Sequence, residues 1–296
     1  MQSKKALNPI TKKEGSLKSP TTIAFLGPEG TFTELAALEH FGRGGDFKPY
    51  ASIDDVFAAV AQKHAKHGVV PVENSTEGAV NNTQDCLIDS LVRIVGEVIL
   101  PVEHHLLMGK DNSTKPLTKI ASHKQSLAQC RKWILKNHPN AQLLECASNA
   151  EAAQLAASDD SIGAIAGKRA ADRYGLISIN QKIQDQRHNS TRFLVLSDKD
   201  AGPALNNKTS LLIYAENKPG SLYRILEPFE NLQISLTKIE TRPSKIEAWA
   251  YVFFIDFEGH ITDKLVEKVF IQLRKCSAEI KILGSYPVFK TEQRNF

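Results

Sequence analysis

The sequence predicts an α/β protein in which a large domain of two lobes precedes a smaller domain with the element order βαββαβ. Two successive sets of apolar strands alternate with segments of helical apolar spacing between residues 21 and 197. A polar stretch at residues 198–208, with glycine, proline and paired asparagines, separates the domains. The length of 296 residues is at the upper limit of about 250–300 residues for one hydrophobic core. We therefore expect domains at residues 21–200 and 207–296.

The first lobe is expected to contain residues 21–103. Its elements are a strand, a Gly-Pro-Glu-Gly turn, a helix, a strand, a helix and a strand, at residues 21–26, 27–30, 31–42, 48–52, 53–62 and 68–72. Strands that alternate with helices in this way predict a mostly parallel sheet. Residues 1–20 carry lysines with no apolar segment after them, so we expect a disordered tail and no signal peptide.

The second lobe, at about residues 104–189, repeats the alternation after an apolar crossing segment at residues 93–109. Its strands are expected at residues 119–123, 141–146, 161–167 and 176–180. Its helices are expected between them, at residues 125–138, 148–158 and 168–175. The apolar strand at residues 191–197 can return to the first lobe, which would then also contain residues 190–200. Two lobes joined by crossing segments predict a cleft between them, and ligands commonly bind at such junctions.

The small domain shows a split-βαβ pattern. Its strand, helix, two strands, helix and final strand are expected at residues 208–216, 221–232, 233–243, 247–259, 262–276 and 279–288. The turn at residues 217–220, Asn-Lys-Pro-Gly, precedes the first helix, so the backbone at Gly220 can approach an anionic group at that helix start. A fold-stabilising turn is the simpler interpretation of the same pattern.

Composition and charge exclude several classes of protein. The net charge is only +4, with basic and acidic residues interspersed, so no nucleic-acid partner is indicated. Cys86, Cys130, Cys146 and Cys276 are too far apart for a zinc motif and do not suggest a disulfide framework. No run reaches the roughly 18 apolar residues of a membrane helix. We expect a cytoplasmic protein with no metal and no membrane partner.

Two polar motifs follow strands of the first lobe. GPEGTFTE, at residues 27–34, lies between a strand and a helix, where backbone N–H groups can hold an anion or Thr31 can act as an ordinary N-cap. PVENSTEGAV, at residues 71–80, places Glu73, Asn74 and Ser75 at the carboxyl end of a strand, where open α/β sheets bind ligands. A solvated loop that caps the next helix is the alternative.

Two further motifs belong to the second lobe and the return strand. In SHKQSLAQC, residues 122–130, Gln125 and Gln129 share one helical face and can line a cleft. In NSTRF, residues 189–193, an arginine can clamp a carboxylate and a hydroxyl can donate to a leaving oxygen. From spacing alone, an arginine that reaches solvent from a strand start is the simpler interpretation.

Taken in this order, the four motifs resemble the successive signatures of prephenate dehydratases. NKPGSLYRIL and IETRP, in the last 90 or so residues, resemble the phenylalanine-binding motifs of that family's regulatory ACT domain. The resemblance is to a monofunctional member, because the residues before Thr21 are too few for a chorismate mutase domain. It implies a two-lobed catalytic domain like type II periplasmic binding proteins, followed by a ferredoxin-like ACT domain.

The resemblance also implies an activity: prephenate becomes phenylpyruvate, water and carbon dioxide in L-phenylalanine biosynthesis, with feedback inhibition by L-phenylalanine and no cofactor. Thr191 would lie at the leaving hydroxyl, and either Arg192 or the helix start after GPEG would hold the pyruvyl carboxylate. The implied catalytic residues are Thr191, Asn74, Ser122, Gln129, Glu73, Ser75, Arg192 and Phe193, and Thr31 and Gln125 would bind substrate. The implied effector-binding residues are Asn217, Gly220, Ser221, Leu222, Glu240, Thr241, Arg242 and Pro243.

Three positions depart from the family pattern: Lys124 replaces a proline, Ser221 an alanine and Thr241 a serine. Two alternatives to the predicted function remain open. Arogenate, with an amino group in place of the keto oxygen, is a possible substrate, and two lobes around a cleft also suit a non-catalytic amino-acid sensor. A homodimer or homotetramer is expected, since sheets of this kind commonly pair their edges across a two-fold axis.

Overall fold

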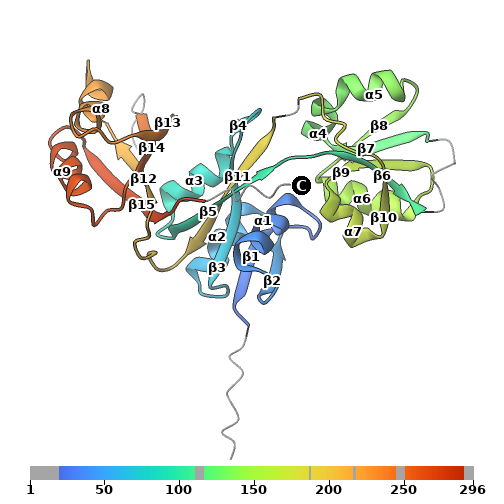
Figure 1. Cartoon of the computed structure of the whole chain (residues 1–296), viewed down its shortest axis with the longest axis horizontal. Coiled ribbons are helices and arrows are strands. Elements are labelled where there is room, and N and C mark those ends of the chain that lie inside the picture. The colour runs from blue at the N-terminus through green and yellow to red at the C-terminus, as the bar shows by residue number, and fades with distance from the viewer. Residues whose placement is uncertain (1–19, 111–116, 187, 216–217, 245–250, 290–296) are drawn as a thin grey trace, which may run out of the picture.

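The computed structural model describes residues 20–110, 117–186, 188–215, 218–244 and 251–289, and it has three β-sheets. Figure 1 shows them in a row, with the first lobe between the second lobe and the C-terminal domain. The expected tail at residues 1–20 lies, except for its last residue, outside the described residues.

The first lobe has six strands and three helices among the described residues. The strands are β1 (Thr22–Leu26), β2 (Asp46–Tyr50), β3 (His67–Asn74), β4 (Gly78–Ala79), β5 (Arg93–Pro101) and β11 (Ser190–Ser197). The helices are α1 (Phe32–Phe41), α2 (Ile53–Ala61) and α3 (Asn81–Asp89). The sheet order is β2-β1-β3-β11-β5, with β4 beside β3. The strand at residues 190–197 thus lies between β3 and β5 in the sheet of this lobe.

The prediction of a mostly parallel sheet is wrong for this lobe. β1 runs parallel to β2 and β3, but β11 runs antiparallel to both β3 and β5. The reason is the connection between the lobes: the chain leaves along β5 and returns along β11, so these neighbours have opposite directions. The resulting sheet is mixed, and it brings the carboxyl end of β3 beside the start of β11.

The second lobe is built on a five-stranded sheet in the order β10-β6-β9-β7-β8. Its strands are β6 (His105–Gly109), β7 (Lys119–His123), β8 (Gln142–Cys146), β9 (Ile162–Ala166) and β10 (Leu176–Asn180). Its helices are α4 (Lys124–Gln129), α5 (Arg131–Asn137), α6 (Asn149–Ser158) and α7 (Lys168–Tyr174). Alanines dominate the packing of α6 and α7 on this sheet, so the helices approach it closely.

The C-terminal domain has the predicted order βαββαβ. Its elements are β12 (Asn207–Tyr214), α8 (Ser221–Asn231), β13 (Leu236–Pro243), β14 (Tyr251–Glu258), α9 (Lys264–Leu273) and β15 (Glu279–Pro287). The sheet order is β13-β14-β12-β15. One face of the sheet packs on α8 and α9 through a core of aliphatic and phenylalanine side chains.

The other face of this sheet packs on the first lobe. Leu212, Phe254 and Leu283 belong to one buried cluster with residues of β3, α2 and α3. β15 passes so close to β5 that a Cβ at Gly284 would lie 2.0 Å from the carbonyl oxygen of Ile94. Glycine is therefore required at this contact, and the two domains share a buried apolar cluster.

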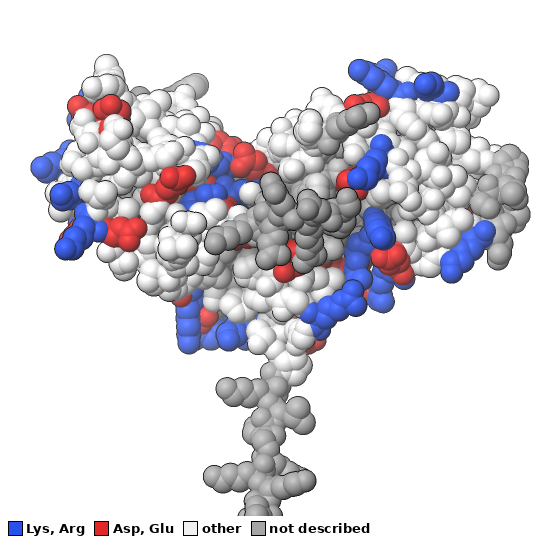
Figure 2. All heavy atoms as spheres, viewed as in Figure 1, with Lys and Arg blue, Asp and Glu red and all other residues white. Residues whose placement is uncertain are grey.

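Charged side chains of both signs are interspersed over the face of the molecule in Figure 2. Within the described part of the chain, no helix is both long enough and apolar enough to cross a membrane.

Candidate active site

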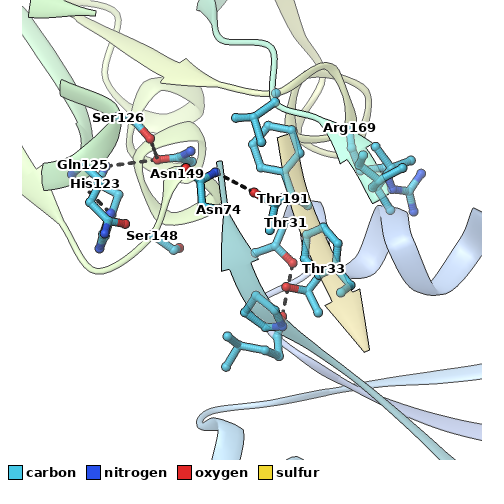
Figure 3. A pocket seen from close by; sticks show the side chains of 18 of the residues that line it. Thr31, Thr33, Asn74, His123, Gln125, Ser126, Ser148, Asn149, Arg169 and Thr191 are labelled. Carbon is cyan, nitrogen blue, oxygen red and sulfur yellow. Dashed lines mark hydrogen bonds between the residues drawn. The ribbon is translucent and has the colours of Figure 1, made fainter. Parts of the chain in front are cut away.

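A cleft with a volume of about 1640 Å³ lies between the two lobes. The ends of β3 and β5, the start of β11 and the beginnings of α1, α4, α6 and α7 all contribute to its wall. Figure 3 shows how polar side chains from these elements approach the same space. The lining residues used below are Thr31, Asn74, Glu77, His104, Gln125, Gln129, Asn149, Lys168, Arg169, Thr191 and Phe193.

Thr191 and Asn74 form the polar centre of the first-lobe wall, as Figure 3 shows. They are paired across β11 and β3, and the Asn74 amide Nδ2 lies 2.8 Å from Thr191 Oγ1. The backbone N–H groups of Thr76 and Glu77 donate to Asn74 Oδ1 at 3.0 and 3.1 Å, which fixes the orientation of the amide. Asn74 is therefore the donor, and Thr191 keeps its hydroxyl hydrogen for another acceptor.

The amides of Asn189 and Gln129 extend this bonding toward the second lobe. Asn74 Nδ2 also donates to Asn189 Oδ1 at 2.8 Å, and Asn189 Nδ2 donates to Gln129 Oε1 at 3.0 Å. Gln129 Oε1 lies 2.9 Å from Nε2 of His104, which is buried. Burial lowers the pKa of His104, so its imidazole is neutral at neutral pH.

A second polar group surrounds Asn149 at the start of α6. Its Oδ1 accepts hydrogen bonds from Ser122 Oγ and Ser126 Oγ, both at 2.9 Å, and from the backbone N–H of His123 at 3.2 Å. These bonds orient the Asn149 amide so that Nδ2 is available to donate into the cleft, which this residue lines. Ser122 itself is fully buried, and its single hydroxyl hydrogen is shared between Asn149 Oδ1 and Ile165 O, which lies 2.6 Å from Ser122 Oγ.

Thr31 acts as the N-cap of α1, in agreement with the simpler interpretation of its motif. Its Oγ1 accepts from Glu34 N at 3.3 Å and donates to Leu26 O at 3.2 Å. Glu34 in turn forms a two-point ion pair with Arg169 of α7, at 2.6 and 3.2 Å. The start of α1 therefore lines the cleft and also joins the two lobes.

Arg192 and Glu73 occupy the opposite face of the same strands. The Arg192 guanidinium donates to Glu97 at 2.7 Å, to Asp256 at 2.6 Å and to the Tyr286 hydroxyl at 2.9 Å. Burial opposes its charge, but these partners outweigh burial and raise the pKa of Arg192. Glu73 accepts from Lys238 of β13 at 3.1 Å. Both predicted catalytic residues thus contact the C-terminal domain and do not line the cleft.

The remaining predicted catalytic and substrate-binding residues fall into two groups. Gln125, Gln129 and Phe193 line the cleft with Thr31, Asn74 and Thr191. Ser75 does not line it, and instead ties β3 to β11, because its Oγ accepts from Ser190 N at 2.9 Å. Among the described side chains, no group of three or more His, Cys, Asp and Glu could hold a metal ion.

The predicted effector-binding residues lie on two elements of the C-terminal domain. Gly220, with φ of 78°, precedes α8; Ser221 caps the turn by donating to Lys218 O at 2.8 Å; and Leu222 is 40% exposed. On β13, Glu240 pairs with Lys238 at 3.1 Å, and Arg242 donates to Asn81, Gln84 and Asp85 of α3. Thr241 and Pro243 complete this strand, and Asn217 lies outside the described residues.

Among the residues that the structure brings to the cleft, sequence reasoning missed His104, Asn149, Lys168 and Arg169. Asn149 and Lys168 are the first residues of α6 and α7, so a search for polar residues at every helix start of the second lobe could have found them. The signal for His104 was a polar residue within the apolar segment that crosses between the lobes.

Comparison with known proteins agrees with this architecture. The family model for prephenate dehydratase matches residues 23–201, and the ACT domain model matches residues 209–274. A bifunctional chorismate mutase/prephenate dehydratase of Pseudomonas aeruginosa is 47% identical over 272 residues, which cover 92% of this chain and 74% of the relative.

Two solved structures are similar over most of the chain. A prephenate dehydratase from Arthrobacter aurescens, in complex with L-Phe, has a TM-score of 0.82 and 31% identity, covering 90% of this chain and 89% of that one. GqqA, described as a novel type of quorum quenching acylase, has a TM-score of 0.82 and 27% identity, covering 90% and 98%. The prephenate dehydratase family model matches more than half of this chain, which therefore belongs to the prephenate dehydratase family.

Proposed function

We propose that this protein is a prephenate dehydratase that converts prephenate to phenylpyruvate, carbon dioxide and water in L-phenylalanine biosynthesis. The observation that carries the proposal is the Thr191 hydroxyl: Asn74 donates to it, so its hydrogen is available to a leaving oxygen in the cleft. The family match supports the same activity.

The reaction needs a hydrogen-bond donor to the departing oxygen more than it needs a strong base. The ring carboxylate departs as carbon dioxide, and its electron pair moves into the ring while the C4 hydroxyl departs. One proton is taken up, so that the hydroxyl leaves as water and the ring becomes aromatic, which drives the reaction without a cofactor. A neutral site that orients prephenate and stabilises the departing oxygen by hydrogen bonding fits this chemistry.

Thr191 is the donor to the departing oxygen. Asn74 holds it in place and is itself connected to Gln129 through Asn189. A threonine hydroxyl is too weakly acidic to act as an independent acid, so it stabilises charge on the oxygen or relays a proton that comes from elsewhere. Phe193, two residues further along β11, borders the cleft but is 1% exposed, so it supports the wall from the core of the first lobe. Gln125 and Asn149 supply amide donors on the opposite wall.

The two carboxylates of prephenate need positive potential, and groups on both walls of the cleft support such a site. Lys168 is exposed at the start of α7 and lines the cleft. The starts of α1 and α6 also line the cleft, and helix starts favour anions. We assign the pyruvyl carboxylate to these groups and not to Arg192, because three partners in the first lobe and the C-terminal domain already occupy the Arg192 guanidinium.

Ser122 and Ser75 support the site from behind its wall. Ser122 orients Asn149, and Ser75 fixes the pairing of β3 with β11 next to Thr191. Glu73 and Arg192 support the same two strands from the side of the C-terminal domain.

L-Phenylalanine is the proposed feedback inhibitor, and the ACT domain is its proposed site. The support is the ACT family match and the L-Phe complex of the Arthrobacter aurescens protein. Gly220 at the start of α8 allows a ligand carboxylate to approach the backbone there. β13 is an edge strand with Ile239 46% exposed, which supports pairing with a second copy in a homodimer or homotetramer.

We also propose that the protein works in the cytoplasm. Its four cysteines, all within the described residues, are free thiols, as is usual in a reducing compartment.

Turnover by the purified protein tests the function. We expect phenylpyruvate to form from prephenate at neutral pH without added metal or cofactor, and millimolar L-phenylalanine to suppress it. Arogenate is assayed in parallel, because an amino group in place of the keto oxygen changes none of the contacts described above. Faster turnover of arogenate than of prephenate would identify arogenate as the preferred substrate. Binding of prephenate without turnover would leave an amino-acid sensor, and hydrolysis of an N-acyl substrate would indicate the acylase activity described for GqqA.

A further inference from the structure

A chain of hydrogen bonds connects Thr191 with His104 at the junction of the two lobes. Its links run from Thr191 to Asn74, Asn189, Gln129 and His104, with donor–acceptor distances of 2.8, 2.8, 3.0 and 2.9 Å. His104 lies between β5 and β6, and Asn189 lies directly before β11. The chain therefore includes a residue from each of the two segments that cross between the lobes.

Each amide in this chain has a determined orientation. The backbone N–H groups of residues 76 and 77 hold Asn74 Oδ1, so Asn74 Nδ2 faces both Thr191 and Asn189. Asn189 Oδ1 is thus an acceptor, and its Nδ2 must donate to Gln129 Oε1. Gln129 Nε2 points the other way, 3.3 Å from Glu77 Oε1 and 3.4 Å from Thr76 Oγ1.

The same logic assigns the tautomer of His104. Gln129 Oε1 can only accept, so the imidazole Nε2 carries the hydrogen that lies between them. His104 is 1% exposed, and its Nδ1 has no hydrogen-bond partner among the residues that the structure describes. The imidazole therefore bonds to the amide chain through its Nε2–H group. The distance from His104 Nε2 to Gln129 Oε1, 2.9 Å, is shorter than either of the distances from Gln129 Nε2 to its own acceptors.

We propose that His104 and Asn189 are positioning residues for the reaction: His104, as its Nε2–H tautomer, fixes Gln129, and Asn189 transmits that orientation to Asn74 and Thr191. If Gln129 turned over, its Nε2 would face Asn189 Nδ2, donor against donor. Asn189 would then turn as well and present its amino group to that of Asn74, which would displace Asn74 from Thr191. The proposal rests on the proposed function, because it assigns these residues to the step that Thr191 assists.

A double-mutant cycle with prephenate tests the proposal. His104→Phe keeps a ring of similar size but removes the donor, and we expect kcat to fall about tenfold while KM changes less than twofold, as for one lost network hydrogen bond. His104→Gln, whose amide nitrogen can replace Nε2, should restore most of kcat. In a Gln129→Met background, His104→Phe should have no further effect, because the link is already absent.

Asn189→Asp provides a second variant of nearly unchanged volume, in case the buried phenylalanine prevents folding. A carboxylate oxygen would then face Gln129 Oε1, and the same selective loss of kcat is expected. Asn137→Asp is the matched control, since Asn137 is an exposed residue of α5 whose side chain, among the described residues, bonds only to Trp133 O of its own helix. Thermal unfolding verifies that each variant is folded.

The possible outcomes separate the two proposals. Absence of turnover by the unaltered protein would refute the proposed function and this inference with it. If the unaltered protein is active, a kcat unchanged by His104→Phe, or a loss of equal size in the Gln129→Met background, would overturn only the positioning role. A ¹⁵N NMR spectrum that showed hydrogen on Nδ1 of His104 would also overturn it, whatever the activity.

Discussion

Two neighbouring residue pairs on β3 and β11 face opposite sides of one sheet and have opposite chemistry. Asn74 and Thr191 are paired and face the cleft with neutral groups. Glu73 and Arg192, the next pair in register, face the C-terminal domain with charged groups. Successive side chains of a strand point to opposite faces, so each of the two motifs places one residue at the cleft and its neighbour at the contact with the ACT domain.

The difference shows what each side requires. On the charged side, Arg192 is only 11% exposed, and such a charge must be paired because an unpaired buried charge is costly. Glu97, whose side chain is fully buried, is shared between Arg192 and Lys208 at 2.7 and 2.8 Å. On the neutral side, Asn74 donates to Thr191, so the Thr191 hydroxyl hydrogen is available to an acceptor in the cleft.

The largest expected effect is on the charged side. Arg192→Met should lower the free energy of unfolding by about 3–5 kcal/mol, because Glu97 and Asp256 lose a buried cation. Since Arg192 does not face the cleft, kcat of the folded variant should change less than threefold. Urea denaturation and prephenate turnover measure the two quantities. Arg93→Met, at a half-exposed interdomain arginine, is the control and should lose less than about 1 kcal/mol. A large loss of kcat with little change in stability would reverse this assignment.

The next effect is on the neutral side. Thr191→Ala should lower kcat by about 10²–10³-fold with a smaller change in KM, the usual result of removing one transition-state donor. Thr191→Ser keeps the hydroxyl and should recover much of the rate. The stability of both variants should remain close to that of the unaltered protein, in contrast with Arg192→Met. Turnover of the alanine variant at the normal rate would remove Thr191 from the mechanism.

The sequence alone could predict the two lobes, the βαββαβ domain and the position of Thr191 and Asn74 at strand ends, because these depend on local periodicity and short motifs. It assigned Arg192 and Glu73 to the same site as their neighbours. The face that each side chain occupies depends on the phase of the strand and on the packing of a domain that follows later in the chain. The direction of β5 and β11 and the place of His104 likewise depend on contacts between distant segments.

Asn74→Asp tests the orientation of the amide with an almost isosteric change. A carboxylate cannot donate, so it would accept the Thr191 hydrogen and repel Asn189 Oδ1, the present partner of Asn74 Nδ2. We expect kcat to fall roughly 10- to 100-fold at neutral pH through loss of the oriented donor. Partial recovery on acidification, as the new carboxyl group takes up a proton and can donate again, would support this cause. A normal kcat would mean that the Thr191 hydrogen has another source of orientation.

Glu73→Gln makes the reverse change at the adjacent residue and should have the smallest effect. Glu73 is 39% exposed, so its ion pair with Lys238 contributes less than about 1 kcal/mol to the free energy of unfolding. Because Glu73 faces the ACT domain, kcat without effector should stay within twofold of normal, while inhibition by L-phenylalanine is the property that the change can alter. Urea denaturation and initial rates with and without L-phenylalanine distinguish these effects. If Glu73→Gln lowered kcat as much as Asn74→Asp, the two faces of the ladder would not be functionally separate, and the charged pair would belong to the catalytic machinery after all.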